Sequence, residues 1–171
     1  MKKAFTLIEL MISIMILSIL MIFLYKSYSS LNISNKKYSN EVQKIKNIEL
    51  IKKTIYLDFT LSAFKSIKIL NQSKTEDVIF MQSSNSIHDR INPYIAYLVK
   101  AKKLYRLESL KPFKFYPLSV DSEFETDFLG KVKNFRVYQN DKNSTSSKYL
   151  VDIDFEKMSD VLLKIKPLNS K

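Results

Sequence analysis

The chain has 171 residues, a formal net charge of +11 at pH 7, one glycine, four prolines and no cysteine. This length accommodates a helical anchor and one globular domain of roughly 100 residues, and the low glycine and proline content argues against a disordered chain. The absence of cysteine excludes a disulfide framework, so the domain must fold by packing alone.

The chain begins with an apolar segment that follows two positive charges. Lys2 and Lys3 precede residues 5–25, a run of 21 residues whose single ionisable side chain is Glu9. At about 1.5 Å per residue, a helix of this length covers ~30 Å, the thickness of the hydrocarbon core of a bilayer. The segment therefore predicts one membrane-spanning helix, with the N-terminus in the cytoplasm and the chain after Lys26 translocated.

A secretory signal peptide is the first alternative for this segment. Its apolar core is usually about 7–15 residues long and ends at a cleavage site of small residues. Here the apolar run is longer, and the residues that follow it, Lys26-Ser27-Tyr28, do not form such a cleavage site. We therefore expect a retained anchor.

Glu9 needs an explanation of its own, because a carboxylate is costly near lipid unless it is solvated at the interface, protonated or paired. One interpretation is a carboxyl group one turn inside the helix, tolerated because it lies close to the headgroups. The other interpretation requires a positively charged partner.

The stretch KKAFTLIELMISIMIL resembles the N-terminal segment of type IV prepilins and of the pseudopilins of type II secretion systems. In that family a prepilin peptidase at the cytoplasmic face cuts before the Phe of FTLIEL and methylates the new amine. The resemblance implies cleavage between Ala4 and Phe5 and N-methylation of Phe5. The family usually has Gly before the cut, where this chain has Ala4; a small residue is retained, so we expect processing.

Processing would place a new amine at Phe5 one helical turn from Glu9 on the same helix. When such helices pack with a stagger, Glu9 of one subunit can neutralise the Phe5 amine of its neighbour, which removes two unpaired charges from a low-dielectric bundle. We therefore predict an assembly salt bridge between Glu9 and Phe5. Loss of Lys2 and Lys3 with the leader would lower the net charge from +11 to +9.

Residues 26–65 continue a helical pattern. Apolar side chains recur mostly three or four residues apart, with no Pro or Gly between them; they include Tyr28, Leu31, Tyr38, Val42, Ile45, Ile48, Ile51, Ile55 and Phe59. The stretch contains eight lysines and three acidic residues. Such a positive surplus ordinarily marks a solvated helix face; the alternatives are a surface that contacts anionic lipid, DNA or acidic partner subunits. We predict one helix, membrane-spanning over 5–25 and amphipathic over 26–65.

Residues 66–171 change to a period of two, which is typical of strands in a globular domain. Strands are predicted over 78–81, 94–100, 103–109, 131–139, 149–155 and 160–166. Residues 94–109 read as a hairpin turning near Lys102, and 140–148 as an exposed loop between two strands. The predicted fold is α+β and pilin-like, a long N-terminal helix packed on an antiparallel β-sheet domain.

Within the family, YIAYLVKAKKLYRLE, DFTLSAF, VKNFRVYQ and VLLKIKPL resemble the J-type minor pseudopilins. This resemblance implies a non-enzymatic subunit of a periplasmic pseudopilus, anchored in the bacterial inner membrane after removal of a leader of residues 1–4. Its partners would be other pseudopilins or pilins, the prepilin peptidase, the inner-membrane assembly platform with its ATPase, and secreted protein cargo.

Two other functions remain open at this point. Minor type IV pilins of DNA-uptake machines share the same pattern, and in that case the basic helix or the domain would contact DNA. A function of another class is an uncleaved single-pass membrane protein with a periplasmic sensor or enzyme domain.

Catalytic and metal-binding patterns are weak. His88 lies in the polar stretch NSIHDR without a cysteine or a second histidine, so a surface loop histidine is the preferred interpretation. Acidic residues alternate over 121–127, where a solvated acidic face is preferred to a calcium site because no D-x-D-x-D-G loop is present; they are Asp121, Glu123, Glu125 and Asp127. With Gly130 as the single glycine, a glycine-rich phosphate loop is excluded. No catalytic residue, metal or cofactor is predicted.

The predicted loop at 140–148 contains the sequon Asn143-Ser144-Thr145. Asp141, two positions before Asn143, resembles the acid of the extended sequon used by bacterial periplasmic oligosaccharyltransferases. Asn32 and Asn71 also begin short sequons, so chance competes with function here. N-glycosylation of Asn143 is a hypothesis.

Overall fold

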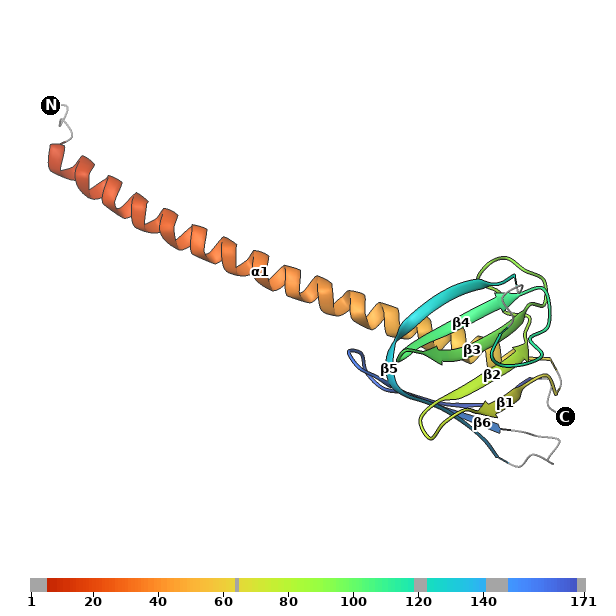
Figure 1. The fold of residues 1–171 in the computed structure, drawn as a ribbon. Helices are drawn as coiled ribbons and strands as arrows, with labels where there is room; N and C mark the ends of the chain where they lie inside the picture. The colour runs from red at the N-terminus through yellow and green to blue at the C-terminus, as the bar shows by residue number, and fades with distance from the viewer. Residues whose placement is uncertain (1–5, 64, 119–122, 141–147, 169–171) are drawn as a thin grey trace. The chain divides into compact units, whose positions relative to one another are not determined.

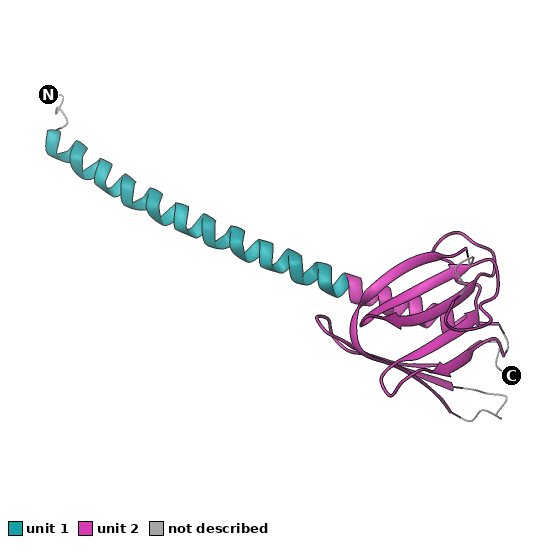
Figure 2. Cartoon of the chain, viewed as in Figure 1, with its two compact units in different colours: residues 1–46 teal, residues 47–171 magenta. Residues whose placement is uncertain are grey.

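The computed structural model describes residues 6–63, 65–118, 123–140 and 148–168 (Figure 1). The chain forms two compact units, Met1–Lys46 and Asn47–Lys171 (Figure 2). The first unit is helical, and the second holds the end of the helix and all the strands. The predicted functional division of the helix at residue 25 and of the domain at residue 66 stays a prediction.

Helix α1 runs from Leu7 to Thr60. Its last part is the one that buries side chains, with Ile48, Ile51, Ile55 and Phe59 spaced three or four residues apart on a single face. The predicted helix extends to residue 65, but α1 ends earlier because Ser62 pairs with Ser83 and the amide of Ala63 donates to the carbonyl of Gln82. The backbone there has joined the sheet.

Seven strands form one antiparallel sheet in which each strand pairs with the next along the chain. Their bounds are β1 (Lys68–Asn71), β2 (Asp77–Gln82), β3 (Tyr94–Lys100), β4 (Lys103–Ser109), β5 (Glu125–Asn140), β6 (Lys148–Phe155) and β7 (Val161–Ile165). Together with α1, the sheet gives the α+β, pilin-like architecture, and the predicted fold class is confirmed.

The strands predicted over 94–100 and 103–109 coincide with β3 and β4 at both ends. Their hairpin turns at Ala101 and Lys102, which both have positive φ, as a tight primed turn between twisted strands requires. Strand β1 was not predicted, because its four residues form a strand only by pairing with β2. Strand β5 begins at Glu125 rather than at residue 131, because residues 125–130 pair with β4, where Asp127 also contacts Arg106.

Strand β5 bends the sheet upon itself. Its first part pairs with β4 and its second part with β6, with register irregularities between Leu104 and Tyr105 and between Val132 and Asn134. The bend passes Gly130, whose φ is +150° and where a Cβ would lie 2.7 Å from the Met158 methyl carbon. A Cβ there would also lie 2.9 Å from a ring carbon of Phe155, and a residue with a side chain would strain the backbone at this φ.

The start of β2 closes the curl by contacting β5. Asp77 is fully buried; it accepts a hydrogen bond from the amide of Val137 at 2.9 Å and lies 3.2 Å from Nε of Arg136. The carbonyls of Ser73 and Lys74, in the β1–β2 turn, accept hydrogen bonds from Nη1 of Arg136 at 3.0 and 2.7 Å. These contacts join the β1–β2 turn and the start of β2 to the second part of β5.

Apolar side chains are buried on both faces of the sheet. One cluster lies between the sheet and the end of α1 and contains Ile55, Phe59, Ile79, Tyr97 and Phe135. Because strand residues alternate between faces, the neighbouring residues of β2, β3 and β4 form a second cluster on the other face; its members are Val78, Phe80, Ala96, Leu98 and Leu107.

Candidate functional site

The N-terminal motif begins α1 with a reciprocal capping arrangement. The backbone N–H and the hydroxyl of Thr6 both donate to Oε2 of Glu9, each at 2.9 Å, and the amide of Glu9 donates to Oγ1 of Thr6 at 3.4 Å. This is a capping box, in which two helix-terminal N–H groups are satisfied by side chains. The Thr-x-x-Glu spacing before an apolar run could have revealed it from the sequence.

The remaining residues of the predicted processing site lie outside the described residues. They are Ala4 and Phe5, so cleavage between them, methylation of Phe5 and its pairing with Glu9 stay predictions. Asn143 also lies outside the described residues, and its glycosylation stays a hypothesis.

Helix α1 is, among the described residues, the one helix that is long and apolar enough to cross a membrane, by length and composition. Its large apolar side chains between Leu7 and Leu24 are more than half exposed in the single chain. The hydroxyls of Ser13 and Ser18 donate to the carbonyls of Glu9 and Ile14, both at 2.8 Å. Since the helix satisfies these polar groups internally, its first part is suited to an apolar solvent.

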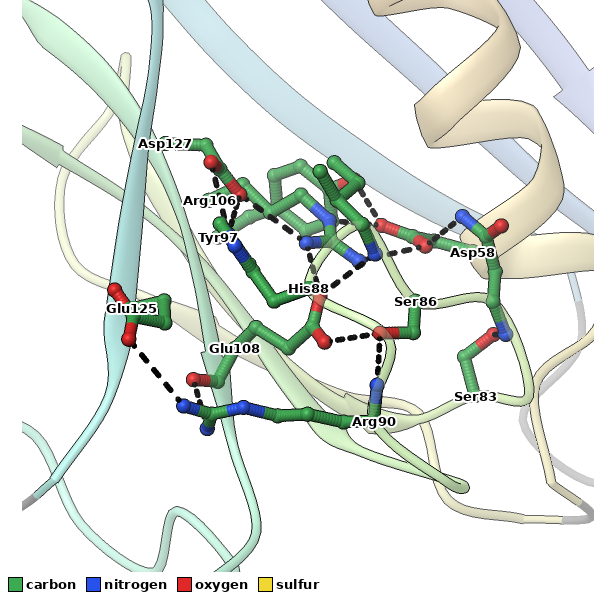
Figure 3. Close-up of polar contacts among 12 residues, drawn as sticks. Asp58, Ser83, Ser86, His88, Arg90, Tyr97, Arg106, Glu108, Glu125 and Asp127 are labelled. Atoms are coloured by element: carbon green, nitrogen blue, oxygen red, sulfur yellow. Dashed lines mark hydrogen bonds and ion pairs between the residues drawn. The ribbon is translucent and has the colours of Figure 1, made fainter.

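A second candidate site is a buried charge cluster centred on Arg106, in the middle of β4 (Figure 3). Nε and Nη2 of Arg106 donate to the two carboxylate oxygens of Asp58, at 2.7 and 3.2 Å. Nη1 donates to Glu108 at 2.7 Å and to Asp127 at 3.3 Å. The side chains of Arg106, Asp58 and Glu108 are fully buried, so the guanidinium is compensated by carboxylates from α1, β4 and β5.

Asp58 is the member of the Arg106 cluster that α1 supplies. It also accepts hydrogen bonds from the hydroxyl of Tyr97 and, at 2.6 Å, from the side-chain amide of Asn85. Burial raises the pKa of Asp58, while the contacts with Arg106, Tyr97 and Asn85 oppose that rise. Burial and the neighbouring Asp58 charge raise the pKa of the Tyr97 hydroxyl well above its usual range, so Tyr97 serves as a hydrogen-bond donor.

The Arg106 cluster holds the loop over residues 83–93, which connects β2 to β3. Glu108 accepts hydrogen bonds from the hydroxyl of Ser86 and from the amide of Ile87, the latter at 3.0 Å. Arg90 donates to the carbonyl of Glu108 at 2.9 Å and lies 3.6 Å from Oε1 of Glu125. One buried carboxylate therefore fixes the middle of an exposed loop.

His88, in the same loop, also contacts the Arg106 cluster. Its Nε2 lies 3.1 Å from Oδ1 and 3.2 Å from Oδ2 of Asp127, and both side chains are half-buried. His88 lies in a loop and is partly exposed, as predicted, but the sequence did not indicate its contact with Asp127, which exists because β5 begins early enough to present Asp127 to the loop. The predicted solvated acidic face over 121–127 is wrong for Asp127, which contacts Arg106 as well as His88.

The Arg106 cluster has the chemistry of a structural site. Its one histidine is bonded to a carboxylate, and its serine, Ser86, donates to Glu108 and accepts from the amide of Arg90 at 2.7 Å. Glu108 also accepts hydrogen bonds from Arg106 and Ile87, and these contacts lower its pKa, so it is a weak base for the Ser86 hydroxyl. Within the described residues there is no group of three or more His, Cys, Asp or Glu that could hold a metal ion.

Sequence reasoning missed Asp58 and Arg106. A partial signal was present, since Leu104, Arg106 and Glu108 alternate on one face of a strand otherwise rich in apolar residues. The face opposite to them also carries apolar side chains, so periodicity alone could not decide which face was buried. The partner on α1 is 48 residues away from Arg106.

Comparison with known proteins identifies the first part of the chain. Residues 1–25 match the family model described as the prokaryotic N-terminal methylation motif. No match was found among curated proteins or among solved structures. The matched segment contains Ala4, Phe5, Thr6 and Glu9 and the apolar first part of the long helix α1, which is consistent with a type IV prepilin-like chain.

We predict that Arg106→Met destabilises the domain by about 3–5 kcal/mol, because it leaves two buried carboxylates without their cation. Arg106→Lys keeps the charge but loses the bidentate contact with Asp58, and should fall between that variant and the native chain. Urea unfolding of the full chain in non-ionic detergent, followed by the near-ultraviolet circular dichroism of tyrosine, measures the effect.

The matched control for Arg106→Met is Lys133→Met, which breaks an exposed ion pair with Asp154 at 3.6 Å. It should change the free energy of unfolding by about 1 kcal/mol or less. Equal stability of Arg106→Met and Lys133→Met would contradict the structural role of the Arg106 cluster.

We predict that the free energy of unfolding depends on pH through the ionisation of Glu108. Burial acts to raise its pKa, but the hydrogen bonds from Ser86, Arg106 and Ile87 outweigh burial and lower the pKa from its ordinary value of 4.5. Ionised Glu108 therefore stabilises the fold above that ordinary value, and the contribution is lost as the pH falls through the lowered pKa. Glu108→Gln should melt at a lower temperature than the native chain at pH ~7, and the difference should shrink at pH ~3. A difference that does not change with pH would show that shape rather than charge matters at this position.

Proposed function

We propose that this chain, which begins with the methylation motif of type IV prepilin-like proteins, is a minor pseudopilin. In this proposal it is a structural subunit of a periplasmic pseudopilus in a type II secretion-like system. The observation that carries the proposal is the match over residues 1–25, which includes the apolar first part of α1, where Glu9 is the one acidic or basic side chain.

The proposed pathway starts with cleavage between Ala4 and Phe5 by the prepilin peptidase and methylation of the Phe5 amine. The mature helix then rests in the bacterial inner membrane, with the β-sheet domain in the periplasm. An assembly platform and its ATPase incorporate the subunit among other pseudopilins, and the domain contacts partner subunits or secreted cargo. The role is non-enzymatic, in keeping with a family of structural subunits.

The contacts of Glu9 support its proposed part in assembly. Both Thr6 contacts use Oε2, so Oε1 can accept a hydrogen bond from the Phe5 amine of a neighbouring subunit without breaking the cap. Pairing would neutralise a carboxylate that is otherwise costly in an apolar bundle. Capping and assembly are therefore compatible functions of one side chain.

A second candidate is a minor pilin of a DNA-uptake machine, and the basic stretch over 26–65 favours it. Two of its eight lysines, Lys44 and Lys52, form ion pairs with Glu41 and Glu49 at 2.7 and 2.8 Å. The stretch keeps a positive surplus that could contact phosphates. Deletion separates the candidates: loss of secretion supports the pseudopilin, whereas loss of transformation with intact secretion supports the pilin.

The N-terminal mass of the native chain tests the proposal most directly. We expect a mature chain that starts with methylated Phe5 in cells with the prepilin peptidase, and an intact leader in cells without it. An unprocessed leader in both strains would overturn the proposal and favour an uncleaved single-pass membrane protein with a sensor or enzyme domain.

Two substitutions separate the roles of Glu9. Glu9→Gln keeps an acceptor for Thr6 but removes the charge, whereas Thr6→Val keeps the charge and removes the hydroxyl from the cap. We expect both variants to be processed, and filament assembly to be lost in Glu9→Gln but retained in Thr6→Val. Immunoblotting of sheared filaments measures assembly. The opposite pattern would mean that Glu9 acts as a helix cap alone.

A further inference from the structure

A strap of residues 110–118 crosses the sheet face that carries the second apolar cluster. Phe113 stacks on Phe80 of β2 with ring centroids 5.8 Å apart, and it contacts the ring of Phe124 at 6.3 Å. Tyr116 and Leu118 also pack against this cluster. The strap is thus fixed to the sheet at its middle, beside Phe80.

Between the strap and strands β3, β4 and β5 lies a pocket of about 690 Å³. Its walls are mainly apolar and aromatic, and include Leu98, Tyr105, Leu107, Tyr116, Leu118 and Phe124. This volume is within the range of roughly 300–1,000 Å³ typical of small-molecule sites. The pocket lies on the other face of the sheet from the Arg106 cluster, since Tyr105 and Leu107 alternate with Arg106 along β4.

The end of the pocket next to the β3–β4 turn is positively charged. Lys100 and Lys103 line it and are register partners across the hairpin, and Lys103 also pairs with Lys131 of β5. Among the described residues that line the pocket there is no Asp or Glu. The site therefore joins a long apolar wall to a cationic end, which complements an amphipathic anion.

The sheet face favours an acyl chain over a peptide. Strands β3 and β4 are paired on both sides, so their backbone N–H and C=O groups are used within the sheet. A bound peptide would bring amides that need new partners, at a cost when they are buried unpaired. A hydrocarbon chain brings no such groups and gains by leaving water.

We propose that this pocket binds a single-chain fatty acid, with its hydrocarbon tail under the strap and its carboxylate between Lys100 and Lys103. This inference goes beyond the proposed role in a pseudopilus and does not depend on it. It gives the domain a lipid ligand whose chemistry is set by one apolar wall and two ammonium groups.

Photolabelling of the full chain tests the proposal. The protein is placed in nanodiscs of zwitterionic phosphatidylcholine and labelled with a palmitate analogue that carries a diazirine in mid-chain; labelled peptides are identified by mass spectrometry. We expect label on residues 98–107, 116–118 and 124–126, displaced by excess palmitate but not by hexadecanol, which lacks the carboxylate.

Variants of exposed positions give matched comparisons. Thr126→Trp fills the pocket and Lys100→Met with Lys103→Met removes the cationic end; each should lower domain labelling about tenfold, as expected for loss of the apolar wall or of a charge-assisted contact. Lys111→Met with Lys114→Met removes the same charge from strap side chains that do not line the pocket, and should leave labelling unchanged.

Three results would overturn the proposal. One is equal labelling of the two double-lysine variants, which would reduce the effect to general charge. Another is equal displacement by hexadecanol and palmitate, which would remove the role of the carboxylate. The third is label confined to residues 7–24, which would place the analogue in the bilayer alone. Near-ultraviolet circular dichroism verifies that each variant is folded.

Discussion

The β-sheet unit depends on the contact between Asp58 and Arg106, which joins the last turns of α1 to the middle of the sheet. Both side chains are fully buried, and the desolvation of two charges is costly unless their geometry is good and their remaining hydrogen-bonding groups are satisfied. Here the guanidinium is bidentate to Asp58, and Tyr97 and Asn85 donate to the same carboxylate. One residue further along α1, Phe59 enters the apolar core between Tyr97 and Tyr149. A rotation of the helix end about its axis would therefore break the charge pair and the aromatic contacts together. Only one orientation of the helix end on the sheet is therefore stable.

The two faces of the sheet are covered by different kinds of interaction. On one face, charges are buried and compensated, and the compensation extends through Glu108 and Asp127 to an exposed loop. On the other face, the strap packs aromatic rings against the sheet and leaves a pocket with lysines at one end. The first arrangement gives rigidity, because every member has a fixed partner. The second leaves room for a ligand, because apolar walls impose few directional demands.

The N-terminal part of α1 follows a different requirement. Its apolar side chains are exposed in the single chain, while its polar side chains bond to their own helix or to Thr6. The polar side chains of such a helix have hydrogen-bond partners, but its apolar side chains have no packing partners within the described part of the chain. Lipid or other helices must therefore cover it. In the proposed role, the subunit moves from a membrane into a filament, which needs a helix that both environments can accommodate.

The sequence by itself determined the features that depend on local order. The leader motif, the single apolar span and the β3–β4 hairpin follow from spacing, periodicity and turn preference within about 25 residues, and the α+β class follows from the change of period from helix to strand along the chain. Tertiary structure alone decided the features that depend on distant partners. Strand β1 exists because β2 pairs with it, β5 starts early because its first residues pair with β4, and His88 contacts Asp127. The Arg106 cluster joins residues up to 48 positions apart, and no local pattern of charge indicates which buried cation will meet which carboxylate.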